Sequence, residues 1–383
     1  MGMTMTQKIL AAHAGLPSVS AGQLIEAELD LVLGNDITSP VAIHEMDKMK
    51  VDGVFDKDKV ALVLDHFVPN KDIKSAEHCK CVREFACRHD ITNYFDVGEM
   101  GIEHALLPEK GLTVAGDVII GADSHTCTYG ALGAFSTGVG STDAAVGYAT
   151  GKAWFKVPET LLFKIDGELN PGVTGKDIIL YIISRLTASG GTGYFIEFAG
   201  EAIRSLSMEG RMTVCNMSIE CGARGGMIAP DQTTFDYLRG RERAPQGAAF
   251  DRAAARWREL HSDADAVFDK EYRFDAADIA PMITYGTNPG MGMAVDAEIP
   301  ADADDKALKY MGFESGETLQ GKPVDYVFVG SCTNGRIEDL RLFARLVEGR
   351  RKADNITAWI VPGSKGVEAA ARAEGLDRIL ADA

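Results

Sequence analysis

The sequence predicts an α/β fold of several domains, in which helices cover mostly parallel sheets. The chain has 383 residues, more than one ordinary hydrophobic core accommodates, so two or three domains are expected. Short runs of consecutive apolar residues, such as 60–64, are typical of strands that are buried on both faces. Segments with apolar residues at helical spacing, such as 71–88 and 337–346, alternate with these runs. This alternation favours parallel sheets.

The first part of the chain is predicted to begin with one long helix. Alanine-rich and leucine-rich periodicity indicates this helix over 6–33, and the glycine and polar residues of 34–40 end it. Cys79 and Cys81 lack the usual metal-binding spacing, so we interpret them as packing residues of a helix. The elements expected next are a strand at 59–64, a helix at 71–88, a strand at 116–122 and a tight helix–loop region at 130–151.

Pro158 marks the first predicted domain boundary. The predicted domains are 1–157, 158–298 and 299–383. The last of them contains a short β-branched and aromatic run, 324–329, which predicts a buried strand. The other elements expected after Pro158 are a strand at 161–165, a helix at 177–186, a solvated helical pair within 238–274, a helix at 337–346, a strand at 358–361 and a final helix.

Polar residues directly follow four of the predicted strands. Ligands bind at the carboxyl ends of the strands in open α/β sheets, so these residues are expected to form one shared site. Three histidines in these turns lie next to acidic residues. Two of them, His66 and His125, follow predicted strands, and His104 ends a glycine-punctuated turn. A carboxylate bonded to a histidine ring fixes its tautomer and raises its pKa, which suits a general acid. The residues that follow the four strands are Asp65 with His66, Asp123 with Ser124 and His125, Cys332, and Ser364.

Cys332 lies in the turn between the strand at 324–329 and the helix at 337–346. Backbone N–H groups and the helix dipole at that place favour an anion, so a thiolate is expected there. A thiolate in this position serves either as a nucleophile or as a metal ligand. The alternative is that Cys332 is a small apolar residue that only fills the turn.

The composition argues against several classes of function. The formal net charge is −17, and phosphate binding needs basic patches, so nucleic acid is not an expected partner. No apolar run reaches the roughly 20 residues that a membrane span needs, so no membrane association is expected. The N-terminus lacks the pattern of a secretory signal. Seven cysteines, an odd number, indicate a reducing compartment and hence a cytoplasmic location.

Five motifs that occur in order along the chain resemble the aconitase family. The similarity extends from about residue 6 to the end of the chain. Residues 222–231 and 284–290 resemble the isopropylmalate and homoaconitate branch of this family more than aconitase itself. The resemblance implies an aconitase-like three-domain α/β/α architecture. The five motifs are Asp65-His66, Gly101-Ile102-Glu103-His104, Asp123-Ser124-His125-Thr126, Asn216-Met217-Ser218-Ile219-Glu220 and Gly330-Ser331-Cys332-Thr333-Asn334.

The resemblance also implies an activity and a partner. The activity is that of a hydro-lyase that isomerises 2-isopropylmalate to 3-isopropylmalate through isopropylmaleate, in leucine biosynthesis. In this branch a large subunit works with a separate small subunit, whose swivelling domain carries a serine that acts as the general base. The expected substrate is therefore a small 2-alkylmalate.

By the same resemblance, three cysteines hold a [4Fe–4S] cluster, and its open iron acts as a Lewis acid on the substrate hydroxyl. Cys332 matches the first of these cysteines. His66, with Asp65, is the candidate that protonates the departing hydroxyl. The resemblance implies that His104 and Asp123 form a second acid–base pair. It also implies that His125 and Glu220 contact the iron-bound oxygen. The residues that it places close to the substrate or the cluster are Ser124, Asn216, Asn334 and Ser364.

The sequence departs from the family pattern near Ala383. The other two cluster cysteines are expected in a CxxC motif after the last helix, and this motif does not occur in the chain. We therefore interpret the chain as a C-terminally incomplete large subunit with a truncated third domain. The hypothesis that follows is that its cluster is absent or incomplete and that the chain as written is inactive.

Three alternatives stay open on sequence alone. The chain could act on homoaconitate or on another alkylmalate by the same chemistry. It could instead be a thiol-dependent transferase or hydrolase, with Cys332 as the nucleophile and a histidine as the base. A third alternative is an RNA-binding relative without a cluster, which the acidic composition disfavours.

Overall fold

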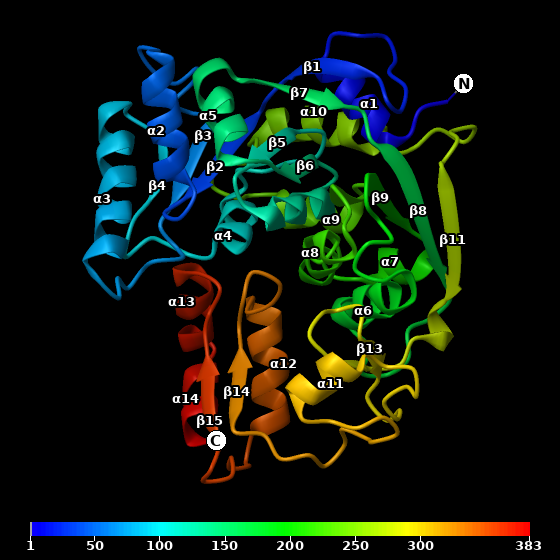
Figure 1. Cartoon of the computed structure of the whole chain (residues 1–383). Coiled ribbons are helices and arrows are strands. Elements are labelled where there is room, and N and C mark those ends of the chain that lie inside the picture. The colour runs from blue at the N-terminus through cyan, green and yellow to red at the C-terminus, as the bar shows by residue number, and fades with distance from the viewer. Residues whose placement is uncertain (1) are drawn as a thin grey trace.

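Three parallel sheets organise the computed structural model, which describes residues 2–383. Figure 1 shows a five-stranded sheet within residues 31–138, a four-stranded sheet within 159–275 and a two-stranded sheet within 326–360. All neighbouring strands within these three sheets run parallel. The predicted α/β fold with parallel sheets is therefore confirmed. The predicted domain boundaries remain predictions.

The five-stranded sheet is covered on both faces. Alternate residues of β3 enter two different cores, because Val60 and Leu62 pack on one face and Ala61 and Val63 on the other. The strand order is β4-β3-β2-β5-β6. The elements of this unit are α1 (Met5–His13), β2 (Leu31–Asn35), α2 (Ser39–Met49), β3 (Val60–Val63), α3 (Ile73–Arg88), β4 (Asn93–Phe95), α4 (Glu103–Lys110), β5 (Val118–Gly121), the 3₁₀ segment η1 (Ser124–Leu132), β6 (Phe135–Gly138) and α5 (Ser141–Thr150).

The prediction of one helix over 6–33 is wrong. Helix α1 ends at His13, and Gly15 and Gly22 then adopt positive φ angles that a helix does not accommodate. Strand β1 (Leu24–Glu28) follows and pairs antiparallel with β7 (Lys152–Lys156). The burial of β1 alternates residue by residue, so its apolar residues fit a strand period. The helix–loop region predicted at 130–151 likewise contains a strand, β6, between η1 and α5.

The four-stranded sheet has the order β10-β9-β8-β11. The solvated helical pair predicted within 238–274 is wrong, because that range contains one helix, α10, and the edge strand β11. Phe250 and Trp257 of α10 are buried in the core, while the charged residues of β11 face solvent at the sheet edge. The elements are β8 (Glu159–Asp166), α6 (Gly175–Leu186), β9 (Tyr194–Ala199), α7 (Glu201–Ser205), α8 (Met208–Asn216), η2 (Ile219–Cys221), β10 (Gly225–Ile228), α9 (Gln232–Leu238), α10 (Gly247–Arg258), β11 (Lys270–Asp275) and η3 (Ala276–Asp278).

The two-stranded sheet is covered on one face only among the described residues. Its helices pack around Leu340, Ala344 and Val367, whereas Tyr326 and Phe328 of β14 are 66% and 57% exposed. The strand predicted at 324–329 therefore forms, but the prediction that it is buried is wrong. The elements after residue 280 are β12 (Met282–Thr284), β13 (Gly292–Ala294), α11 (Asp305–Met311), β14 (Tyr326–Val329), α12 (Ile337–Val347), β15 (Thr357–Ile360), α13 (Lys365–Ala373) and α14 (Leu376–Asp382).

The remaining predicted elements form close to their expected bounds. These are the strands β3, β5, β8 and β15 and the helices α3, α6 and α12. Cys79 is buried in α3, as predicted for a packing residue, and Cys81 is half-buried. Within residues 2–383, no helix combines the length and the apolar character that a membrane crossing requires.

Candidate active site

The carboxyl ends of β2, β3 and β5 bring acidic and histidine side chains together. Asp36 follows β2, Asp65 and His66 follow β3, and Asp123 follows β5. The two carboxylate oxygens of Asp36 accept hydrogen bonds from the backbone N–H groups of His66 (3.0 Å) and Phe67 (2.8 Å). Asp36 is fully buried, so these bonds fix the turn that carries His66. Sheet topology thus positions this part of the site.

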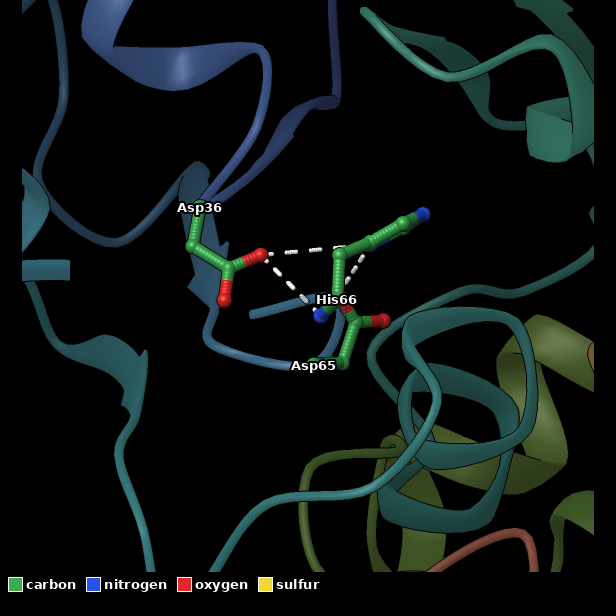
Figure 2. A group of neighbouring side chains, drawn as sticks. All are labelled: Asp36, Asp65 and His66. Carbon is green, nitrogen blue, oxygen red and sulfur yellow. Dashed lines mark hydrogen bonds and ion pairs between the residues drawn. The ribbon is translucent and has the colours of Figure 1, made fainter. Parts of the chain in front are cut away.

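His66 forms a close ion pair with Asp65, and Figure 2 shows this pair beside Asp36. Its Nδ1 atom lies 2.6 Å from Asp65 Oδ1, and its Nε2 atom lies 3.7 Å from Asp123 Oδ2. The hydrogen bond to Asp65 outweighs partial burial and raises the pKa of His66 to about 9. His66 therefore carries a proton at neutral pH, and its side chain is 36% exposed, so it can reach a ligand.

His104 has the opposite character. It is buried, and burial lowers the pKa of its imidazole despite a hydrogen bond to Asp123. A neutral ring donates from Nε2 to Asp123 Oδ1 (2.9 Å), and its Nδ1 atom lies 3.0 Å from the hydroxyl oxygen of Tyr129. The neutral His104 and the charged His66 thus share one carboxylate, that of Asp123.

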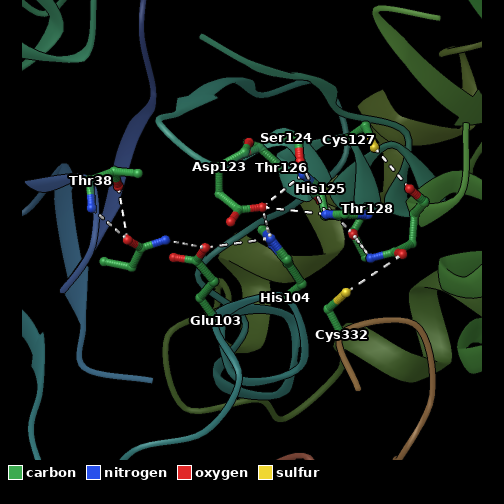
Figure 3. Close-up of polar contacts among 12 residues, drawn as sticks. Thr38, Glu103, His104, Asp123, Ser124, His125, Thr126, Cys127, Thr128 and Cys332 are labelled. Atoms are coloured by element: carbon green, nitrogen blue, oxygen red, sulfur yellow. Dashed lines mark hydrogen bonds and ion pairs between the residues drawn. The ribbon is translucent and has the colours of Figure 1, made fainter. Parts of the chain in front are cut away.

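Asp123 is the centre of the histidine group in Figure 3. Burial would raise its pKa, but hydrogen bonds from His104 and His125 outweigh burial and hold the pKa well below the usual range. His125 also lies 2.9 Å from Glu220 Oε1 through its Nε2 atom. Its contacts with Asp123 and Glu220 raise the pKa of His125 to about 10, so His125 is charged. Ser124 lies at the edge of this group, 3.2 Å from His125 Nδ1.

The Cys332 turn (residues 330–336) closes the site from the third sheet. Asn216 of α8 contacts it: its Oδ1 accepts a hydrogen bond from the Thr333 hydroxyl (3.0 Å) and lies 3.9 Å from Cys332 Sγ. The first free amides before α12, those of Gly335 and Arg336, both donate to Asp339 at 2.9 Å. These two amides therefore bind the carboxylate of Asp339, and the thiolate expected at Cys332 remains a prediction.

Two other predicted residues have local partners in the structure. Ser364 forms an isolated bridge with Gly101, accepts from the Val367 N–H as the N-cap of α13 and bonds to Glu109. The side-chain N–H₂ of Asn334 donates to Asp339 and Thr213. The structure does not show Ser364 in a hydrogen bond with any of the site histidines, so its predicted contact with a ligand remains a prediction.

Sequence reasoning missed Glu103 and Asp36 as site residues. Glu103 is fully buried, and its Oε1 accepts from the side-chain N–H₂ of Asn35 at 3.1 Å. Burial, with Asp65 and Asp123 nearby, raises the pKa of Glu103 well above its usual range, which favours its protonated form. The signal for Glu103 was its place beside His104 in a motif. Asp36 gave no signal because the segment before it was interpreted as a helix.

We expect Glu103→Gln to change how stability depends on pH. The folded protein holds the Glu103 proton more tightly than the unfolded chain, so the wild type loses stability as the pH rises above the usual glutamate range. Glutamine removes this loss, which is at most about 1.4 kcal/mol per pH unit. Urea unfolding at pH 5 and pH 8 should show the variant gaining stability relative to the wild type at pH 8. Identical pH dependence of both proteins would show that Glu103 is ionised when folded.

The thiols described here do not form a three-cysteine set. Within residues 2–383, two groups place three or more candidate ligand atoms within 4.8 Å of one another, and neither contains a cysteine. Cys127, Cys215 and Cys221 are fully buried, and burial raises the pKa of each thiol. Among the described cysteines, only Cys332 is half-buried and also lies near the histidine group. The described residues therefore fit one thiolate ligand of a cluster and not three.

The chain is similar to proteins of one known family. A family profile described as "Aconitase family (aconitate hydratase)" matches residues 7–383. A 3-isopropylmalate dehydratase large subunit from Lachnoclostridium phytofermentans is 52% identical over 376 residues, which is 98% of this chain and 82% of the relative. Proteins of the same name from Heliobacterium modesticaldum (49%, 100% of this chain, 84% of the relative) and Clostridium kluyveri (50%, 98% and 82%) are similarly close.

Proposed function

Because the chain belongs to the aconitase family, we propose that it acts as the large subunit of a hydro-lyase that isomerises 2-isopropylmalate to 3-isopropylmalate. The reaction passes through isopropylmaleate and serves leucine biosynthesis. The names of relatives about half identical over nearly the whole chain support this assignment. The single structural observation that carries it is a charged histidine, His66, that lies beside the carboxylates of Asp65 and Asp123.

The chain's own residues supply the proton that the departing hydroxyl needs. His66 donates its proton to that oxygen, which leaves as water with the C–O electron pair. A base takes the proton from the neighbouring carbon, and the C–H electron pair becomes the double bond of isopropylmaleate. Asp65 and Asp123 stabilise the charged form of His66 before the transfer. Rehydration at the other carbon reverses these steps, and His66 regains its proton.

The other charged groups are proposed to hold the substrate. We propose that the ring edge of the charged His125 faces the dicarboxylate substrate. Glu220 fixes the ring through the 2.9 Å contact. The neutral His104 bonds to Asp123, which therefore stays ionised and keeps its second oxygen turned toward His66. We propose that this His104–Asp123 pair is the second acid–base unit. The carbon base is proposed to come from the swivelling domain of a small-subunit partner.

Membership of the aconitase family implies a [4Fe–4S] cluster in the complete enzyme. We propose that Cys332 is one of its thiolate ligands and that no other thiol of residues 2–383 completes a three-cysteine set with it. Neither described group of candidate ligand atoms contains a cysteine, which supports this proposal. The chain by itself is then expected to hold no intact cluster and to be inactive. Seven free cysteines also support the proposed cytoplasmic location.

A thiol-dependent transferase or hydrolase gains no support from the structure. Among the described residues, the hydrogen-bond neighbours of Cys332 Sγ are Asn216 and Thr333, neither of which is a base. The charge of Cys332 contributes to the raised pKa of His125, but His125 is already charged and bonded to Glu220, so it is not free to accept the thiol proton.

Substrate comparison tests the assignment. The holoenzyme, meaning the full-length large chain with its small subunit and cluster, should convert 2-isopropylmalate with a higher kcat/KM than homoaconitate or other alkylmalates. A higher kcat/KM for homoaconitate would support the proposed chemistry but would assign homoaconitate as the substrate. No turnover of any alkylmalate by a cluster-loaded complex would overturn the proposal.

Asp65→Asn should shift the alkaline limit of dehydration to lower pH. Activity requires protonated His66 and falls as the pH rises through its pKa of about 9. Asparagine removes the carboxylate that most strongly favours the charged ring, so this limit should move down by about 1–3 pH units. The pH profile of kcat for the holoenzyme measures the shift, with Asp90→Asn, an exposed carboxylate, as the control. An unchanged alkaline limit would exclude His66 as the acid.

A further inference from the structure

Helix α4, which carries His104, lacks one of its usual hydrogen-bond donors. In an α-helix the N–H of residue i+4 donates to the carbonyl of residue i. Four residues after His104 the helix contains Pro108, which has no N–H. Both His104 and Pro108 are buried, so the carbonyl of His104 needs a donor from elsewhere in the protein.

The side chain of Arg336 supplies that donor from the Cys332 turn. Its Nη2 atom lies 3.4 Å from the His104 carbonyl oxygen and 3.3 Å from the Cys332 carbonyl oxygen. Its Nη1 atom donates to the Thr333 carbonyl at 2.6 Å. Arg336 is 5% exposed, so these contacts form in a site shielded from water. One guanidinium thus bonds to two segments that are 232 residues apart in sequence.

We propose that Arg336 is a positioning residue that fixes the Cys332 turn against the helix that carries His104, and that Pro108 creates the need for it. The guanidinium suits this task because its planar donors reach three carbonyls at once, which a lysine ammonium on its flexible stem does not reproduce. The inference rests on the proposed function only in treating Cys332 as a ligand and His104 as an acid–base residue.

The Cys332 turn has a second anchor, on the same Thr333 carbonyl, that provides a matched control. Thr213 of α8 donates from its hydroxyl to the Thr333 carbonyl at 3.0 Å. This contact holds the Cys332 turn to α8 and does not involve α4. Loss of Thr213 should therefore loosen the turn alone, whereas loss of Arg336 should loosen the turn and α4 together.

Hydrogen exchange of the 383-residue chain tests this proposal. In Arg336→Met the amides of 330–336 and of 103–110 should both exchange about tenfold faster or more, since hydrogen bonds to a charged group are lost. In Thr213→Val only the amides of 330–336 should respond. Arg336→Lys should fall between Met and wild type, and it replaces Met if that variant does not fold.

A proline substitution separates positioning from general destabilisation. Pro108→Ala restores the backbone donor to the His104 carbonyl, so Pro108→Ala/Arg336→Met should recover slow exchange at 103–110 but not at 330–336. Unchanged exchange at 103–110 in Arg336→Met, or no recovery in the double variant, would overturn the proposal.

In the holoenzyme Arg336→Met should lower kcat with little change in KM. If the exchange coupling appears but alkylmalates are not converted, the proposed function fails and this inference stands.

Discussion

Replacing His66 with glutamine is expected to lower kcat for dehydration by about 10²–10⁴-fold, the usual contribution of a general acid. Glutamine keeps much of the side chain's size but carries no transferable proton. The pKa of about 9 means that the wild-type ring is charged over the whole neutral range, so the loss should be nearly constant between pH 6 and pH 8. KM should change little, because His66 acts on the departing oxygen and not on the carboxylates.

His44→Gln is the matched control for this experiment. His44 lies exposed on α2, outside the group at the strand ends, so its loss should leave kcat unchanged. Steady-state kinetics of the holoenzyme in the dehydration direction compares the two variants. A kcat within a few fold of wild type for His66→Gln would assign the acid to another residue and would leave the Asp65–His66 pair a structural role.

Cluster content should depend completely on Cys332. The 383-residue chain should bind near-zero iron and acid-labile sulfide after anaerobic reconstitution, because its described thiols form no three-cysteine set. The full-length chain should load a cluster, and Cys332→Ser in it should reduce iron, sulfide and activity to background. Cys87→Ser, which alters an exposed thiol of α3, should load normally.

Two outcomes would contradict this expectation in different ways. A stoichiometric cluster in the 383-residue chain would mean that other cysteines, such as Cys127 or Cys215, complete the site after rearrangement. Full iron content in Cys332→Ser would remove Cys332 from the ligand set. Either result would leave the fold and the acid–base group unchanged, since neither depends on the thiol.

The sequence predicted the part of the site that strand ends determine. Asp65, His66 and Asp123 follow buried apolar runs, and parallel strands necessarily bring such residues to one edge of the sheet. Asp36 was missed because the alternating strand β1 and the buried strand β2 were interpreted as one helix. The apolar residues of 24–33 fit both periods, and only tertiary pairing decides between them.

Other features depend on neighbours that are distant in sequence. The raised pKa of Glu103 follows from complete burial beside Asp65 and Asp123, which no local pattern encodes. The contact of Arg336 with the His104 carbonyl joins the Cys332 turn to α4, and its only local signal is Pro108 in α4. The exposure of β14 was also missed, because an apolar run gives no information on which strand face is covered.

Direct detection of isopropylmaleate is the most decisive measurement. The holoenzyme would be mixed with 2-isopropylmalate, and the conjugated double bond would be followed by ultraviolet absorbance, with His66→Gln measured in parallel. The account predicts that the wild type forms isopropylmaleate and then 3-isopropylmalate, while His66→Gln forms the intermediate far more slowly. Equal rates of formation in the two proteins, or no intermediate from a fully loaded wild-type complex, would contradict it.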